Sequence, residues 1–107
     1  MTVLFQDKEI QNLYVAGSSG NKLYKKLSRQ KTFMRDFIKV MQILFSVSDV
    51  DELRKYGVLN YEKLKHDLGG KSSVRIGYCT KYRLIFTESE DKITITLLEI
   101  NEHYGDK

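Results

Sequence analysis

The stretch SVRIGYCTKYRLIFTESEDKITITLLEI, residues 73–100, decides the fold, because apolar and polar residues alternate three times along it. The alternation covers 73–78, 82–87 and 93–98, and a period of two indicates strands with one buried face. The polar triplet 89–91 between the last two predicts a tight hairpin. Three strands joined by short turns predict an antiparallel meander, and residues 61–65 are expected to add an edge strand.

The part of the chain before this stretch has the spacing of helices. We expect a strand over 3–5, a helix capped by Asp7, a loop at 17–20, a short helix around Leu23 and Leu27, a long helix over 30–47, and a third short helix that opens at Ser48 or Asp49 and stops at Gly57. One strand, then helices, then strands predicts an α+β fold with the helices on one face of a twisted sheet. The length of 107 residues predicts a single domain, 1–107.

The long helix carries the clearest apolar stripe of the sequence. Its members recur at three and four residues, which is typical of a helix face that packs into a core. We expect this core stripe to consist of Phe33, Phe37, Met41 or Val40, Leu44 and Phe45. A Phe–Met stripe can also grip a partner, but core packing is the far commoner role.

Composition excludes several classes of protein. No run of apolar residues is long enough for a membrane span, and the N-terminal residues lack the pattern of a signal peptide. One cysteine, Cys79, excludes an internal disulfide and fits a reducing compartment, and one Cys with two His supplies no four-ligand zinc site. The fragment 68–73 lacks the first glycine of a phosphate-binding loop. We therefore expect no metal, no cofactor and no membrane partner.

Charge is the first positive indication of function. The net charge is +4 and the pI about 9.1, and residues 1–56 hold 10 basic and 6 acidic residues. In the strand region four cations stand out: Lys63, Lys65, Arg75 and Arg83. If the strands around the two arginines pair as a hairpin, all four cations are expected on one sheet face with no acid between them. Such a face suits a phosphate backbone, although an ordinary solvated polar face is the alternative.

Two residues after the last predicted strand add candidate groups to this predicted phosphate-binding face. His103 exchanges protons near neutral pH, and Tyr104 can stack on a base or hydrogen-bond a phosphate. A metal-free RNA-cleaving site needs a group that deprotonates the ribose 2′-OH, cations for the phosphate and an acid for the leaving 5′-oxygen. The lone Cys79 is more often a packing residue than a nucleophile.

Three blocks resemble one known family in their order and spacing: LKHDLGGKSSVRI at 64–76, YRLIF at 82–86 and INEHY at 100–104. Together with the N-terminal strand and helices, they make the chain similar to the HigB branch of the RelE/ParE toxin superfamily over nearly its whole length. The resemblance implies a compact α+β, microbial-ribonuclease-like fold. It also implies a cytoplasmic bacterial toxin of a type II toxin–antitoxin pair that cuts mRNA in the ribosomal A site.

The same resemblance implies partners and roles for residues. The partners would be a HigA-like helix-turn-helix antitoxin, the ribosome and its mRNA, with operator DNA bound only through the antitoxin. Arg83 and Arg75 would stabilise the phosphate, Lys65 would anchor it, His103 would act as general base or acid, and Tyr104 would orient or stack. Lys63 is a weaker candidate for RNA contact.

The helices add a second basic group. Lys22, Lys25, Lys26 and Arg29 are expected to meet ribosomal RNA phosphates, with a solvated helix face as the alternative. Two other functions stay open: a ParE-like poison of DNA gyrase, which uses the same fold without the catalytic cations, and a non-catalytic RNA- or protein-binding module such as a degenerate toxin kept as a co-repressor.

Overall fold

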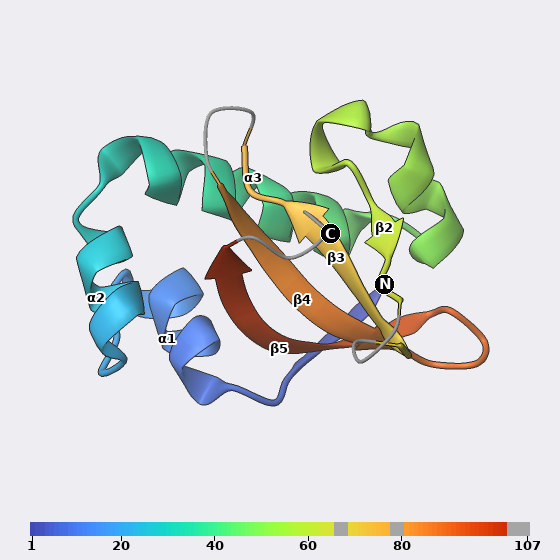
Figure 1. Cartoon of the computed structure of the whole chain (residues 1–107), viewed down its shortest axis with the longest axis horizontal. Coiled ribbons are helices and arrows are strands. Elements are labelled where there is room, and N and C mark those ends of the chain that lie inside the picture. Colours follow the sequence, from blue (N-terminus) through green and yellow to red (C-terminus); the bar gives the residue numbers. More distant parts are fainter. Residues whose placement is uncertain (66–68, 78–80, 103–107) are drawn as a thin grey trace.

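The computed structural model of the chain describes residues 1–65, 69–77 and 81–102 (Figure 1). Its elements are β1 (Thr2–Phe5), α1 (Lys8–Ala16), α2 (Lys22–Ser28), α3 (Lys31–Ser46), two 3-10 helices (Val50–Lys55 and Gly57–Leu59), β2 (Glu62–Lys63), β3 (Lys71–Arg75), β4 (Tyr82–Glu88) and β5 (Thr94–Glu102). The predicted order of strand, helices and strands is confirmed.

The strands form a five-stranded sheet in the order β1-β5-β4-β3-β2. The predicted meander is present, because β3 pairs antiparallel with β4 and β4 antiparallel with β5. Strand β1 pairs parallel with β5, from Thr2 opposite Thr94 to Phe5 opposite Leu97. This pairing places β1 at one edge of the sheet, and within residues 1–65, 69–77 and 81–102 no strand pairs with the second half of β5 on that side.

Helix starts follow the predicted caps. The Asp7 carboxylate accepts a hydrogen bond from the Glu9 amide at 2.9 Å and opens α1. Asp49 accepts one from the Glu52 amide at 3.1 Å, and the Glu52 carboxylate accepts one from the Ser48 amide at 2.6 Å. These bonds satisfy amides that have no partner inside the first helical turn.

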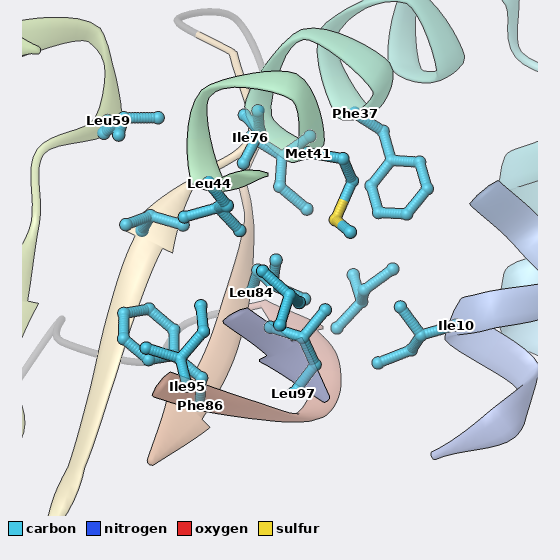
Figure 2. Close-up of a cluster of buried hydrophobic side chains, with 14 of the residues drawn as sticks. Ile10, Phe37, Met41, Leu44, Leu59, Ile76, Leu84, Phe86, Ile95 and Leu97 are labelled. Carbon is cyan, nitrogen blue, oxygen red and sulfur yellow. The ribbon is translucent and has the colours of Figure 1, made fainter. Parts of the chain in front are cut away.

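The core lies between α3 and one face of the sheet. Figure 2 shows Phe37, Met41 and Leu44 of α3 gathered with Leu84, Phe86 and side chains of β5, and Ile10 reaching in from α1. The even-numbered residues of β4 face this core because successive side chains of a strand point to opposite faces. The fold is therefore α+β with the long helix against one face, as predicted.

Four details of the sequence prediction are wrong. Phe45 is 43% exposed, because it lies one residue beyond the buried line that ends at Leu44. Gly57 begins a second 3-10 helix instead of ending the region. The edge strand predicted over 61–65 is only the two residues of β2, and the strand predicted over 73–78 is β3, which ends at Arg75.

A hydrogen bond from β5 to Tyr24 joins α2 to the edge of β5 that β1 does not cover. The Tyr24 hydroxyl accepts this hydrogen bond from the Ile100 amide at 3.0 Å, beyond the point where β1 stops. Burial is the main cause that raises the pKa of Tyr24 to about 12.

Among the described residues no helix combines the length and apolar character needed to cross a membrane.

Gly77 follows β3 and lies against the side chain of Asp36 on α3. Its φ is +81°, a conformation that strains residues with a Cβ. A Cβ at this position would overlap the Asp36 carboxylate and lie 2.8 Å from its Cγ. Gly77 therefore lies against the Asp36 side chain in a backbone conformation that favours glycine.

Replacing Gly77 with alanine is expected to lower the free energy of unfolding by at least about 1–2 kcal/mol, because the left-handed backbone alone costs that much. Urea unfolding of Gly77→Ala and of the control Gly57→Ala measures the difference. At Gly57 an added Cβ meets no atom within 4 Å, so we expect little change. Adding Asp36→Ala to Gly77→Ala should recover only the part of the loss that comes from overlap; equal losses at both glycines would contradict the assignment.

Candidate nucleic-acid interface

Arg83 lies on the sheet face away from the core, and neighbouring polar groups bind its guanidinium. Its Nε donates to Ser73 Oγ at 2.8 Å and its Nη2 to the Asn60 carbonyl at 2.6 Å. The same Nη2 is 3.0 Å from Glu62 Oε2. Only 7% of the residue is exposed. A buried guanidinium needs such partners, and they fix the orientation of its plane.

Arg75 is the neighbour of Arg83 across the sheet. The two are register partners of β3 and β4, so their side chains point to the same face, as predicted. Asn101 of β5 is the next register partner of Arg83 and continues the row. Arg75 is half-buried, so this row brings two cations side by side with one of them accessible from solvent.

The alternative of a plain solvated face does not fit this region. Ser73 and Ile85 lie on the same face as Arg83 and both are fully buried. A sheet face that merely meets water exposes its polar side chains, whereas here an arginine and a serine are enclosed together. Arg83 and Ser73 therefore form an enclosed polar cluster, and the half-buried Arg75 lies next to it.

Glu62 is the residue of this site that the sequence analysis missed. Its carboxylate pairs with Arg83, and its side chain is 40% exposed. It is the register partner of Ser73, which also binds Arg83. A half-exposed carboxylate paired with Arg83 is a group that could accept a proton from a bound ligand. The expectation that no acid lies among the cations is wrong.

Lys63 does not join the arginines. It pairs in register with Ser72, one residue away from the Glu62–Ser73 pair, and therefore points to the opposite face. Its Nζ is 3.7 Å from Glu88 Oε1. The prediction that all four cations share one face is wrong for this reason. Lys65 is exposed and lies just past the end of β2.

Glu88 collects three partners on the core side of the sheet edge. The hydroxyls of Tyr61 and Ser72 both donate to its Oε2, the second at 2.5 Å, and Lys63 lies beside its Oε1. Its side chain is only 10% exposed. Burial is the first cause, and the bond to Glu88 the second, that raise the pKa of Tyr61 to about 12.

The basic residues of the helices are accessible. Lys22, Lys25 and Lys26 lie on α2 and Arg29 follows it, and all four are exposed. Lys25 and Lys26 occupy the last turn, where cations are favoured by the helix carbonyls. They form a positive surface on α2, separate from the row on the sheet.

Two predicted site residues, His103 and Tyr104, lie outside the described part of the chain, and so does Cys79. His66 and Asp67 of the first resemblance block lie outside it too. Within residues 1–65, 69–77 and 81–102, no three His, Cys, Asp or Glu side chains come together as metal ligands.

Solved structures of three toxins match nearly the whole chain. A YoeB/ParE toxin from Agrobacterium tumefaciens aligns with a TM-score of 0.57 at 14% identity, over 97% of this chain and 100% of that one. The archaeal RelE–RelB complex from Pyrococcus horikoshii OT3 gives 0.55 at 18%, over 94% and 92%. The YoeB–YefM toxin–antitoxin complex from Staphylococcus aureus gives 0.50 at 19%, over 97% and 98%.

The chain has the fold of the RelE and YoeB toxins. At these identities the likeness concerns the fold alone. No family model matches the sequence, and no curated protein matches it either. The RelE-like fold that the sequence blocks implied is confirmed, whereas placement in the HigB branch stays a prediction.

Within the described part of the chain, Tyr24 and Tyr61 are expected to ionise late. Because the folded pKa of Tyr24 and Tyr61 is raised to about 12, their stabilising contribution is complete below pH 10 and is lost as the pH rises through about 12. Absorbance of tyrosinate during a base titration measures this. Tyr61→Phe should lower the late signal by the absorbance of one tyrosinate; an unchanged late phase would show that Tyr61 does not ionise late.

Proposed function

We propose that the chain is the toxin of a bacterial type II toxin–antitoxin pair, of the HigB kind, that cleaves mRNA on the ribosome. The observation that carries the proposal is the Arg75–Arg83 row with Glu62 paired to it. Two cations suit the charge that develops on a phosphate during cleavage, and the carboxylate supplies a proton acceptor. The RelE/YoeB fold supports the same reading.

The proposed reaction uses the ribose 2′-OH as nucleophile. Glu62 takes the 2′-OH proton, the 2′-oxygen forms a bond to phosphorus, and the bond from phosphorus to the 5′-oxygen breaks. His103 donates the proton that the leaving 5′-oxygen needs. The products are a 2′,3′-cyclic phosphate and a free 5′-hydroxyl, and every atom and proton is accounted for.

The remaining predicted residues have supporting roles in this proposal. Arg75 contacts the phosphate through its accessible side, and Arg83, fixed by Ser73 and Asn60, stabilises the developing charge and orients Glu62. Lys65 anchors the message, and Tyr104 stacks on a base. No step requires a metal ion or an organic cofactor.

The partners of the proposed toxin are those that the resemblance to the HigB branch implies. In the cytoplasm, the ribosome presents the mRNA, a HigA-like helix-turn-helix antitoxin neutralises the toxin, and operator DNA is bound only through that antitoxin. The exposed basic side chains of α2, and more weakly Lys63, contact ribosomal RNA phosphates. An RNA surface of this kind binds more weakly as salt rises, because counterions are released on binding.

Cleavage of a defined mRNA in a reconstituted translation reaction, read by primer extension, tests the function. We expect cuts only with ribosomes present. Arg75→Ala and Glu62→Gln should each lower the cleavage rate by about a hundredfold, the usual contribution of one positioned acid–base or charge-stabilising group. Lys81→Ala is the matched control, because Lys81 is an exposed cation next to β4 that pairs with Glu102.

Arg83 needs a different variant, because a buried, bonded guanidinium also supports the fold. Arg83→Lys keeps the charge and loses the fork of donors, so activity should fall while most stability remains. Intact mRNA with unimpaired translation would overturn the proposal and favour a gyrase poison or an inert module, which a gyrase supercoiling assay separates.

Removing two cations from α2 tests the RNA surface. We expect Lys25→Ala/Lys26→Ala to weaken ribosome binding and to reduce the slope of log affinity against log salt by about one to two. The control is Lys8→Ala, a single exposed lysine on α1. Binding measured across a salt series decides; an unchanged slope would show that α2 is only solvated.

A further inference from the structure

The edge strand β2 is held by side chains on both faces of the sheet. It consists of two residues, and its two register pairs with β3 are Glu62–Ser73 and Lys63–Ser72. Both members of the first pair bind Arg83, and both members of the second bind Glu88. Two residues of β4, one on each face, therefore fasten the same short strand.

The backbone alone holds β2 weakly. A strand of two residues makes few ladder bonds, and the next bond along the chain is the Leu64 amide to the Lys71 carbonyl at 2.9 Å. The position of Glu62 must therefore be set by contacts of the side chains around it. On the sheet face of Glu62, the contacting side chain is Arg83, which is itself part of the candidate site.

The other face supplies a fixed anchor. Glu88 is almost buried and accepts hydrogen bonds from the hydroxyls of Tyr61 and Ser72. Tyr61 and Lys63, the residues on either side of Glu62, are both bound to Glu88. The guanidinium of Arg54 lies 4.8 Å from the centre of the Tyr61 ring and closes that side. The two residues next to Glu62 in the sequence are therefore both bound to the carboxylate of Glu88.

We propose that Glu88 is a positioning residue for the Glu62–Arg83 pair, acting through Tyr61 and Lys63 from the opposite face of the sheet. The role in catalysis rests on the proposed function, whereas the anchoring of β2 does not. Glu88 itself does not touch the message. It sets the distance between Glu62 and the phosphate-binding arginines, and small displacements of such a group lower the rate steeply.

Glu88→Gln is the central variant, because it keeps the size and one acceptor oxygen but removes the charge that faces Lys63. We expect its kcat for cleavage to fall by at least about tenfold with little change in KM, since Arg75 and the exposed cations of α2 do not depend on Glu88. Tyr61→Phe should lower kcat by a smaller factor. Glu90→Gln is the matched control: it removes an exposed carboxylate two residues away, in the hairpin.

A purely structural role predicts a different result. In that case Glu88→Gln lowers the folded fraction, and kcat per folded molecule, with the fraction taken from urea unfolding, equals that of Glu90→Gln. Equality of the two corrected kcat values overturns the proposal. A fall in corrected kcat without a matching change in KM supports it.

Hydrogen exchange provides a readout that needs no enzymatic activity. The Leu64 amide reports the pairing of β2 with β3, and we expect its exchange to accelerate at least about tenfold in Glu88→Gln but not in Glu90→Gln. If the wild-type protein cleaves no mRNA, the proposed function fails, and Leu64 exchange still decides whether Glu88 anchors β2. Unchanged exchange in both variants overturns the anchoring.

Discussion

The period of two along β4 is the constraint on which the other features depend. Residues 84 and 86 of this strand point into the core beneath α3, so residues 83 and 85 must point the other way. That alternation places a guanidinium on the outer face and, five residues later, a carboxylate on the core face. Both are almost buried, and a buried charge is tolerated only where groups of opposite charge or polarity meet it. Neighbouring segments supply those groups: Asn60, Glu62 and Ser73 to Arg83, and Tyr61, Lys63 and Ser72 to Glu88.

Much of the fold could be predicted because it depends on local patterns. Caps at Asp7 and Asp49 and the line from Phe33 to Leu44 follow from interactions within one or two helical turns. The parallel pairing of β1 with β5 joins residues more than ninety positions apart, and no local pattern encodes it. The single wrong member of the core stripe, Phe45, shows the limit of spacing alone: it stacks on Tyr14, with ring centres 5.8 Å apart, but stays near solvent at the end of α3.

The site was harder to predict because it depends on register. The sequence shows that Lys63 and Lys65 would point to the same side of a strand, and that Arg75 and Arg83 could meet on one sheet face. It does not show which residues of the edge segment point to the face of the arginines. In the structure Glu62, the residue just before Lys63, is the one on their side. A shift of one residue exchanges a cation for an anion, and with it the character of the site changes from a bare positive face to an arginine–carboxylate pair.

The bond from the Ile100 amide to the Tyr24 hydroxyl has a consequence for how the molecule meets copies of itself. Beyond Leu97, no strand of the described part of the chain pairs with β5 on the β1 side, and such an edge offers amides on which another chain could add a strand. Here α2 brings a phenol to one of those amides from 76 residues away, so the donor is already used. The same helix carries exposed lysines, which repel an identical helix. The helix that borders the second half of β5 thus protects the sheet against edge-to-edge aggregation.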